Sequence, residues 1–461
     1  MASSGYEKDK IHVLMKKLLS GPETPESFFS FPGYRYVDLY EKAGGISAEL
    51  ARCGSDKKPV CLFSENHFVI AATLLAVLGG GPPVVIPHSL SKSVFDQLHD
   101  ITGFDTVITD CRDCFHEKVK TIVPGSLEGQ KGIKGQGHDM DPDRVWGHLF
   151  TGGTTGNPRL WPKTVRNLLS EACYITDRYG FSKDDRVLAT VPPYHIYGLL
   201  YSVLSPLVAS CSVISQIPSF PGEINSALKE KKATILVSVP AHYRALKSNM
   251  KKTRDLRIAF SSAGPLPRPD GEAFTHRSGV DVIEVYGSTE TGGIATRCRA
   301  KGEDTMRPYG CIDWKIKGET LLIRSDFLAP GLTADPDGFY KMSDRVVPAG
   351  DHGFVVKGRS DSVVKVGGKR VELEDLKCAI LTIDGVTNVC LLTRPVESGR
   401  ENEIFALVEG DVDRPDIVQG LTGLIEPHMR PRVIKVVPKI PMAPTGKIDR
   451  KTIESFFENF L

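Results

Sequence analysis

The feature that most constrains the fold is an alternation between about residues 145 and 290. Short runs of β-branched residues alternate there with segments of helical period, and turn residues stand at every join. This alternation is typical of parallel strands, because each return to the start of the sheet needs a crossover helix. The predicted strands are one that ends at Thr151 and others at 186–191, 212–216, 233–239, 257–261 and 282–286. The predicted helices are 165–179, 197–208, 223–231 and 241–249.

Residues 55–110 repeat the theme, with predicted strands at 59–63, 83–87 and 106–109. Two stacked α/β layers should result. After Arg307 the pattern changes to short strands and glycine turns, and a compact α+β segment follows Gly358. We therefore predict an α/β fold with a large N-terminal domain over 1–358 that includes a small β-rich subdomain. A hinge at 359–361 and a small mobile C-terminal domain over 362–461 complete the prediction.

Composition narrows the function classes. The 461 residues carry 58 Lys and Arg against 56 Asp and Glu, a net charge of +2, so no global field favours nucleic acid or an anionic membrane. The ten cysteines lack the spacing of a disulfide framework, which suits a reducing compartment. Glycines and prolines at 79–83 interrupt the longest apolar stretch, and charges run through the N-terminal residues. We expect a cytoplasmic protein with neither nucleic-acid nor membrane partners.

The strongest local motif follows the predicted strand that ends near Phe150. Its glycines allow backbone N–H groups to turn toward an oxyanion, and its threonines add hydroxyl donors, so the run can wrap a polyphosphate. The spacing is not that of a Walker loop, and a glycine-rich surface loop is the alternative. The motif consists of Thr151, Gly152, Gly153, Thr154, Thr155 and Gly156, with Arg159 after Asn157 and Pro158.

Three further segments follow predicted strands, at the edge where open α/β sheets hold ligands. Small residues at Ser262, Ala263 and Gly264 would admit a planar ring against the backbone. The next segment joins an aromatic face to a hydroxyl and a carboxylate, suited to phosphate and Mg²⁺. The residues concerned are Tyr286, Gly287, Thr289 and Glu290, and the third segment, 192–198, contains His195. A structural role would explain any one of them, but their convergence favours a ligand site.

Five ordered segments resemble the motif series of adenylate-forming enzymes, which include acyl- and aryl-CoA synthetases, the adenylation domains of peptide synthetases, and luciferases. They are 151–159, 286–291, Tyr340-Lys-Met-Ser-Asp344, 358–372 and Pro441-Met-Ala-Pro-Thr-Gly-Lys447-Ile-Asp-Arg450. The resemblance covers essentially the whole chain. It implies a two-step ligase, in which a carboxylate attacks the α-phosphorus of ATP to give an acyl-adenylate and pyrophosphate, and a thiol then displaces AMP.

The resemblance also implies a role for each motif. The loop at 151–156 would close over the β- and γ-phosphates, Thr289 would contact the α-phosphate, and Glu290 would bind Mg²⁺. Ala263, Gly264 and Tyr286 would bracket adenine, and Asp344, assisted by Arg359, would bind the ribose hydroxyls. Lys447 would bridge the attacking carboxylate and the α-phosphate.

The same resemblance implies domain alternation. Asp361 matches the hinge about which the small domain rotates between the two half-reactions. Rotation would withdraw Lys447 and bring the hairpin that carries Gly367, Gly368 and Lys369 to the channel of the thiol.

Some positions depart from the family pattern. Arg159-Leu160 stands where the family usually has Lys-Gly. The arginine keeps the positive charge, but its planar guanidinium differs in geometry from an ammonium group, so the affinity for the nucleotide can change. The aspartate that pairs the substrate ammonium in amino-acid activators is missing from 194–197, and His195 resembles the gate of acyl- and aryl-CoA ligases. The candidate substrate pocket consists of His195, Tyr197, His242, Tyr243 and Ser262.

We expect a small carboxylic acid without an α-amino group, either aryl, hydroxyaryl or short acyl, because the pocket residues mix aromatic and polar side chains. The expected cofactors are ATP and Mg²⁺, and the acceptor is either CoA or the phosphopantetheine of an acyl carrier protein. A nucleotide-binding homologue without catalysis, an amino-acid adenylating enzyme and a luciferase-type oxygenase are the alternatives. Intact Glu290, Asp344 and Lys447 oppose the first of these.

Overall fold

The computed structural model describes most of the chain and divides it into two compact units. The first unit is Met1–Asp313 with Arg324–Gly338, and the second is Trp314–Ile323 with Phe339–Leu461. This division does not test the domain hinge predicted at 359–361, which stays a prediction. The described residues are 8–54, 58–110, 119–130, 132–133, 141–151, 159–359, 363–366, 369–395, 402–442 and 448–458.

The first unit contains a nine-stranded sheet whose middle strands are parallel. Its order is β15 (Arg307–Pro308), β14 (Gly292–Cys298), β13 (Val282–Ser288), β12 (Ile258–Ser261), β11 (Ile235–Ser238), β9 (Arg186–Ala189), β10 (Ser212–Ile214), β1 (Phe28–Phe31) and β2 (Tyr34–Arg35). All four residues of β11 are buried, as expected for a parallel strand covered on both faces. The parallel arrangement predicted from the alternation is therefore confirmed.

A second, six-stranded sheet holds the N-terminal strands. Its order is β6 (Lys120–Ile122), β5 (Thr106–Ile108), β3 (Val60–Leu62), β4 (Val84–Ile86), β7 (Val145–Thr151) and β8 (Arg159–Thr164). The strands are parallel except for β8, which runs antiparallel to β7. Strands β7 and β8, on either side of the loop proposed to wrap phosphate, thus form an antiparallel hairpin at this sheet's edge.

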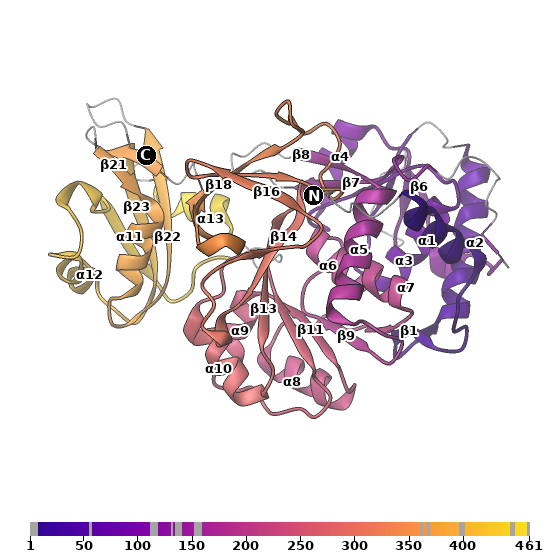
Figure 1. Ribbon diagram of the computed structural model, residues 1–461, viewed down its shortest axis with the longest axis horizontal. Coiled ribbons are helices and arrows are strands. Elements are labelled where there is room, and N and C mark those ends of the chain that lie inside the picture. The colour runs from indigo at the N-terminus through magenta and orange to yellow at the C-terminus, as the bar shows by residue number, and fades with distance from the viewer. Residues whose placement is uncertain are drawn as a thin grey trace. The chain divides into compact units, whose positions relative to one another are not determined.

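Helices cover both sheets (Figure 1). Helix α3 (His67–Leu78) is buried at all twelve residues, so it is an internal helix without a polar face. Helix α5 (Val165–Tyr179) begins at a capping box between Thr164 and Asn167, which fixes where β8 ends. The remaining helices of this unit are α1 (Lys8–Ser20), α2 (Tyr36–Cys53), α4 (Lys92–Thr102), α6 (Ile196–Leu199), α7 (Ser205–Ala209), α8 (Pro221–Glu230), α9 (Pro240–Leu246) and α10 (Arg268–Ser278).

One hydrophobic cluster joins the nine-stranded sheet to α8, α9 and α10. It includes Leu236 and Ala259 from the strands and Leu228, Tyr243 and Phe274 from the three helices. The sequence pattern missed α10, because its mean polarity is high and only Phe274 among its large residues is buried. The predicted helix at 197–208 is confirmed as helical, with a π-helical turn, Leu200–Leu204, between α6 and α7.

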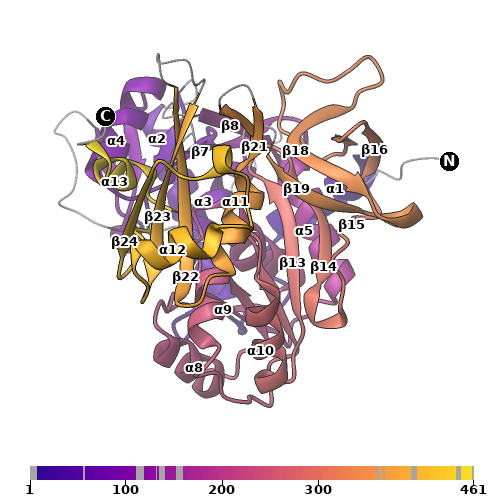
Figure 2. The same ribbon diagram turned by 90° about the vertical axis from the view of Figure 1, so that its left-hand side faces the viewer.

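The second unit contains a four-stranded sheet of β16 (Asp313–Lys317), β17 (Thr320–Arg324), β18 (Tyr340–Pro348) and β19 (Phe354–Arg359). A hairpin of β20 (Val363–Val366) and β21 (Lys369–Glu372) follows. The last sheet is β22 (Val386–Pro395), β23 (Asn402–Gly410) and β24 (Val433–Val437). Separate apolar clusters join it to α11 (Leu373–Leu381) with α12 (Arg414–Leu421), and to α13 (Arg450–Ser455) (Figure 2).

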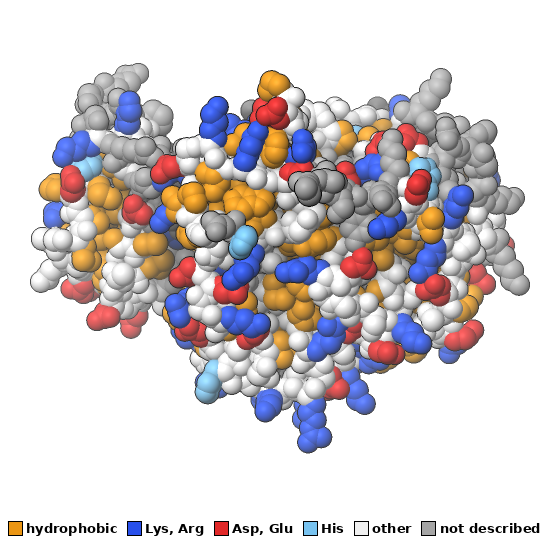
Figure 3. All heavy atoms as spheres, viewed as in Figure 1, with side chains coloured by type: hydrophobic (Ala, Val, Ile, Leu, Met, Phe, Trp, Pro, Cys, Tyr) orange, Lys and Arg blue, Asp and Glu red, His pale blue; other side chains and the backbone are white. Residues whose placement is uncertain are grey.

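The face of the molecule in Figure 3 carries charges of both signs. Basic and acidic side chains are interspersed over the face that Figure 3 shows, consistent with a net charge of +2. Among the described residues, no helix is both long and apolar enough to cross a bilayer.

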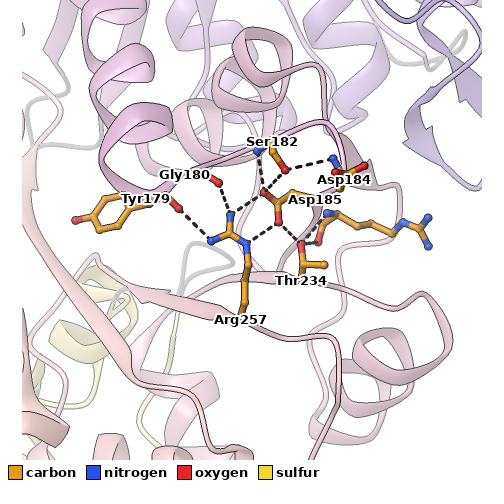
Figure 4. A network of polar contacts seen from close by, with 8 residues as sticks. Tyr179, Gly180, Ser182, Asp184, Asp185, Thr234 and Arg257 are labelled. Carbon is orange, nitrogen blue, oxygen red and sulfur yellow. Dashed lines mark hydrogen bonds and ion pairs between the residues drawn. The ribbon is translucent and has the colours of Figure 1, made fainter.

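A polar network fixes the amino-terminal edge of the nine-stranded sheet (Figure 4). Asp185, only 5% exposed, accepts two hydrogen bonds of 2.7 Å from Arg257. Thr234 donates to the same carboxylate at 2.7 Å, and the amide of Ser182 at 2.9 Å. Arg257 also donates to Gly180 at the end of α5. These residues precede β9, β11 and β12, so the network joins three strand starts to one helix end.

We predict that Asp185→Asn lowers the free energy of unfolding by about 2–3 kcal/mol at neutral pH, because it removes a charge-assisted pair from a buried position. Burial raises the pKa of Asp185, but the bonds from Arg257, Thr234 and Ser182 outweigh it and lower that pKa below its ordinary value. The stabilisation is thus present above the unfolded pKa of about 3.9 and lost as the pH falls through the folded one. Urea titrations of both proteins at several pH values should show the difference shrink in acid. A difference independent of pH would contradict the assignment.

Candidate active site

Four segments follow parallel strands of the nine-stranded sheet at its carboxyl edge. They are 190–198 after β9, 239–242 after β11, 262–264 after β12, and the turn after β13. Because β9, β11, β12 and β13 are consecutive in the sheet, these segments are neighbours. The sequence prediction that these motifs share one edge is correct, and this is the edge at which open α/β sheets bind ligands.

The turn between β13 and β14 presents Thr289 and Glu290, both half-buried. Thr291 closes it: its hydroxyl accepts from the Ser288 amide at 3.1 Å and lies 2.9 Å from the Ser288 hydroxyl. The carbonyl of Glu290 accepts from the Ala329 amide at 2.8 Å. Hydrogen bonds to Thr291 and Ala329 therefore hold the backbone of the turn, while the side chains of Thr289 and Glu290 remain partly accessible to solvent.

Gly287 has a steric reason to be glycine. A Cβ there would lie 2.2 Å from the carbonyl oxygen of Gly292 on the neighbouring strand. Backbone atoms cannot give way at that distance, so β13 and β14 approach closely only because this position lacks a side chain. The glycine shapes the turn and leaves the backbone beside Tyr286 exposed.

The segment after β12 has a strained backbone. Ala263 has φ of 70°, in the left-handed region that residues other than glycine rarely adopt, at a cost of order 1 kcal/mol. Ala263 and Gly264 are exposed, and a Cβ on Gly264 would meet nothing within 4 Å. The Ser262 hydroxyl donates to Val285 at 3.0 Å and so joins this segment to β13. Strained, open backbone of this kind is typical of a surface that a ligand approaches.

A chain of hydrogen bonds connects the ends of β9 and β11. Nδ1 of His242 lies 2.7 Å from the hydroxyl of Thr190, which lies 2.7 Å from that of Ser238. The hydroxyl of Tyr197 donates to the Ser238 carbonyl at 3.2 Å. Burial lowers the pKa of His242, so its ring is neutral at pH 7. The structure thus brings His242 and Tyr197 together, with His195 two residues before Tyr197.

Tyr243 does not belong with these residues. Its side chain has no exposed surface, packs edge-to-face against Phe274 in the core, and donates its hydroxyl proton to the Phe260 carbonyl at 2.7 Å. Tyr243 was among the predicted pocket residues. Since successive residues of α9 point in different directions, only His242 faces Thr190.

The phosphate-loop hairpin is described at its two ends. Thr151 and Arg159 form the last pair of β7 and β8, and the Thr151 hydroxyl donates to the Arg159 carbonyl at 3.4 Å. The Arg159 guanidinium lies 5.9 Å from the ring centroid of Trp161. The remaining predicted residues of the loop, Gly152, Gly153, Thr154, Thr155 and Gly156, lie outside the described residues.

In the second unit, Asp344 and Arg359 are directly opposite each other in β18 and β19. The two residues predicted to bind ribose are therefore cross-strand neighbours. Lys369, at the start of β21, is exposed, and its ammonium lies 3.2 Å from the Glu426 carboxylate. Asp361, Gly367, Gly368 and Lys447 lie outside the described residues.

Sequence reasoning missed two buried charged residues behind the turn, Lys163 of β8 and Glu171 of α5. Lys163 donates to the Glu290 carbonyl, and Glu171 accepts from the Gly293 amide. No sequence motif joins these residues to the turn, which lies more than a hundred residues away. A lysine inside a short strand that follows a glycine-rich loop was the one available signal.

Within the described part of the chain, no three His, Cys, Asp or Glu side chains are grouped so as to hold a metal ion. Mg²⁺ bound with a nucleotide commonly takes one or two carboxylates and completes its shell with phosphate oxygens and water. Glu290, the carboxylate predicted for this role, is half-buried on its turn.

The fold and this edge define a class of protein: α/β proteins with candidate ligand-binding segments at the carboxyl ends of parallel strands. A model of the family described as AMP-binding enzyme matches residues 24–327. The chain therefore belongs to the AMP-binding enzyme family. The resemblance to adenylate-forming enzymes, the α/β fold and the ligase class of the reaction are thereby confirmed.

Individual relatives are distant. The chain is similar to a sulfoacetate–CoA ligase of Cupriavidus necator, 25% identical over 332 residues, which are 66% of this chain and 65% of that enzyme. A probable CoA ligase of Humulus lupulus is 26% identical over 482 residues, covering 91% of this chain and 87% of that protein. The O-succinylbenzoate–CoA synthetase of Bacillus subtilis, solved with ATP and a magnesium ion, superimposes with a TM-score of 0.81 at 16% identity, covering 96% of this chain and 99% of that one.

Activation of a carboxylic acid with ATP, followed by transfer to CoA, is accordingly the reaction that the family and its CoA-ligase relatives support. The chain spans just under two thirds of the sulfoacetate enzyme. The particular acid, the carrier-protein acceptor and the role of each residue are matters of proposal.

Proposed function

We propose that this protein activates a small carboxylic acid without an α-amino group, aryl, hydroxyaryl or short acyl, to an acyl-adenylate and transfers it to the thiol of CoA. A carrier-protein phosphopantetheine is the second acceptor to test. The observation that carries the proposal is the convergence of His195, Ala263, Tyr286 and Glu290 on one edge of one sheet. The named CoA ligases among the relatives support it.

In this proposal the turn after β13 binds the reacting phosphate. Thr289 would donate to the α-phosphate, and Glu290 would hold Mg²⁺, which supplies positive charge as the α-phosphorus is attacked. The ring of Tyr286 and the open backbone at Ala263 and Gly264 would enclose adenine. In-line displacement at phosphorus requires positioning and charge neutralisation rather than a covalent intermediate with the protein.

The pocket for the acid would lie at the neighbouring ends of β9 and β11. Tyr197 bonds to Ser238 at the end of β11, and His242 bonds to Thr190, which follows β9 and lies 2.7 Å from the Ser238 hydroxyl. Two rings and two hydroxyls at these two strand ends favour a compact acid with a polar or aromatic body over a long alkyl chain. We propose His195 as the aromatic group that separates this pocket from the approach of the thiol.

The experiment is carboxylate-dependent exchange of pyrophosphate into ATP across aryl, hydroxyaryl, short acyl and amino acids. Exchange with one of the first three classes is expected, and thioester formation is then measured with CoA and with a carrier protein. Exchange with amino acids alone would replace the proposed substrate class. If no acid supports pyrophosphate exchange although calorimetry shows that the protein binds ATP, the alternative of a nucleotide-binding homologue without catalysis would be favoured.

A separate prediction concerns the second half-reaction. Gly368→Leu should leave pyrophosphate exchange within about twofold of the wild type and lower thioester formation by at least about tenfold, because a bulky side chain at the tip of the β20–β21 hairpin would obstruct the thiol. Lys365→Ala, on the strand before the tip, is the control for a general effect on the hairpin. A normal thioester yield from Gly368→Leu would remove the hairpin from the mechanism.

A further inference from the structure

Lys163 is a fully buried lysine whose ammonium group donates hydrogen bonds to backbone carbonyls. Its side chain is 1% exposed, and its ammonium donates to Phe327 at 2.8 Å and to Glu290 at 3.3 Å. Phe327 lies in the loop that also supplies the Ala329 amide to Glu290. One ammonium group therefore joins the turn after β13, the loop at 326–329 and the strand that leaves the phosphate-loop hairpin.

Glu171 binds the other side of the same turn. Its carboxylate, 2% exposed, accepts the Gly293 amide at 2.6 Å. A Cβ on Gly292 would lie 2.3 Å from this carboxylate, and a Cβ on Gly293 would lie 2.9 Å from the ring of Tyr309. Gly292 also has φ of 68°. The two glycines thus permit the carboxylate to approach the backbone directly behind Thr289 and Glu290.

The two charges cost free energy to bury, and most of their hydrogen bonding goes to this turn and its neighbouring loop. Burial lowers the pKa of Lys163 and raises that of Glu171, while the attraction between the two opposes both shifts. Glu290 also faces Lys163, and Tyr309 and Cys311 face Glu171. Apolar residues of similar volume would avoid this cost, so the structure retains the charges where they hold the main chain of the turn and of the loop beside it.

We propose that Lys163 and Glu171 are positioning residues that hold the turn carrying Thr289 and Glu290 in the geometry that binds the α-phosphate and its Mg²⁺. This inference rests on the proposed function, because it assigns the pair a role toward the nucleotide. Lys163 fixes the carbonyl of Glu290, and Glu171 fixes the amide three residues later. The same lysine lies four residues after Arg159, so it also couples the turn to the base of the phosphate-loop hairpin.

The test compares Lys163→Met with a matched control in the β13–β14 hairpin that carries the turn. Arg297→Met breaks a buried ion pair with Glu284, 2.7 Å long, near the opposite end of β13 and β14. Both variants should lose stability, because each removes a cation that neutralises a buried carboxylate; Glu284 keeps a second cation, Arg299, at 3.6 Å. Only Lys163→Met should accelerate amide hydrogen exchange at 289–293 in the protein without nucleotide, by at least about tenfold relative to the wild type.

The kinetic expectation separates positioning from stability. In Lys163→Met, kcat/KM for Mg·ATP in pyrophosphate exchange should fall by about 10²-fold, the order expected for a misplacement of about 1 Å, while the KM for the acid stays within about twofold. Arg297→Met, assayed well below its unfolding temperature, should keep the wild-type value. Equal losses in the two variants, or unchanged hydrogen exchange at 289–293 in Lys163→Met, would overturn the proposal.

A double variant distinguishes the loss of positioning from a general loss of stability. Lys163→Met with Glu171→Gln removes both charges and leaves no lone buried carboxylate, so it should regain much of the lost stability. It should not regain the hydrogen-exchange protection at 289–293 or kcat/KM for Mg·ATP, and recovery of both would show that the pair is only a charge pair. If the wild type exchanges no pyrophosphate with any acid, the proposed function fails. The hydrogen-exchange comparison then still decides whether Lys163 fixes the turn.

Discussion

Lys447→Ala is expected to lower the rate of acyl-adenylate formation by about 10²–10³-fold, because an ammonium group that neutralises charge in the transition state is worth that order of rate. The resemblance of the segment around Lys447 to the last motif of adenylate-forming enzymes is the basis. Thioester formation from preformed acyl-adenylate should stay within about twofold, since rotation of the small domain would have withdrawn the lysine. Single-turnover measurements of the two half-reactions, each started separately, give the two rates.

The matched control for this experiment is Lys439→Ala, an exposed lysine eight residues earlier, just before the segment that contains Lys447. It should leave both half-reactions unchanged, which would exclude a general effect of removing positive charge. If Lys447→Ala slowed both half-reactions equally, the lysine would act through the structure of the small domain rather than through the first transition state. Domain alternation about Asp361 would then lose its main support.

Glu290→Gln is the second large effect that we expect. The substitution keeps the shape of the side chain and the backbone of the turn, whose carbonyl bonds to Ala329 and Lys163 do not involve the carboxylate. It removes the negative charge that Mg²⁺ requires of its protein ligand. Pyrophosphate exchange should fall by about 10²-fold, and the Mg²⁺ concentration at half-maximal rate should rise by about tenfold.

Two comparisons make the Glu290 result specific. Glu290→Asp keeps the charge on a shorter side chain and should recover part of the rate at high Mg²⁺. Glu272→Gln changes an exposed glutamate of α10 that pairs with Arg268, and it should alter neither the rate nor the Mg²⁺ dependence. A Glu290→Gln enzyme with wild-type Mg²⁺ dependence would mean that another group holds the metal with the nucleotide.

Much of the fold was predictable because its signals are local. The strands that follow one another through β9, β10, β11, β12 and β13 are short apolar runs between turn residues, and each was found near its true position. The helix α10 was missed because burial of Phe274 against α9 comes from tertiary packing, while its own residues are polar. The antiparallel strands β14 and β15, which extend the sheet past β13, lack the alternation that identifies the parallel strands.

The residues of the candidate site that belong to sequence motifs were predictable, but the residues that contact them were not. Motif residues such as Tyr286, Thr289 and Glu290 were identified from spacing and from the resemblance, and the structure places them on one turn. Tyr243 was predicted for the pocket together with His242, although the helix turns its side chain into the core. The hydroxyl chain from His242 through Thr190 to Ser238 was not predicted, because its members come from two strands about fifty residues apart in sequence.

The sequence by itself determined the α/β class, the order of the motifs and the chemistry of the residues that carry them, because hydrophobic period and motif spacing are properties of neighbouring residues. Only the tertiary structure decided which side chains support those motifs. Lys163 and Glu171 are separated from Glu290 and Gly293 by more than 110 residues, and their bonds exist because β8 and α5 pack behind the turn. Burial and hydrogen bonding depend on what the rest of the chain brings to a position, and a local pattern does not contain that information.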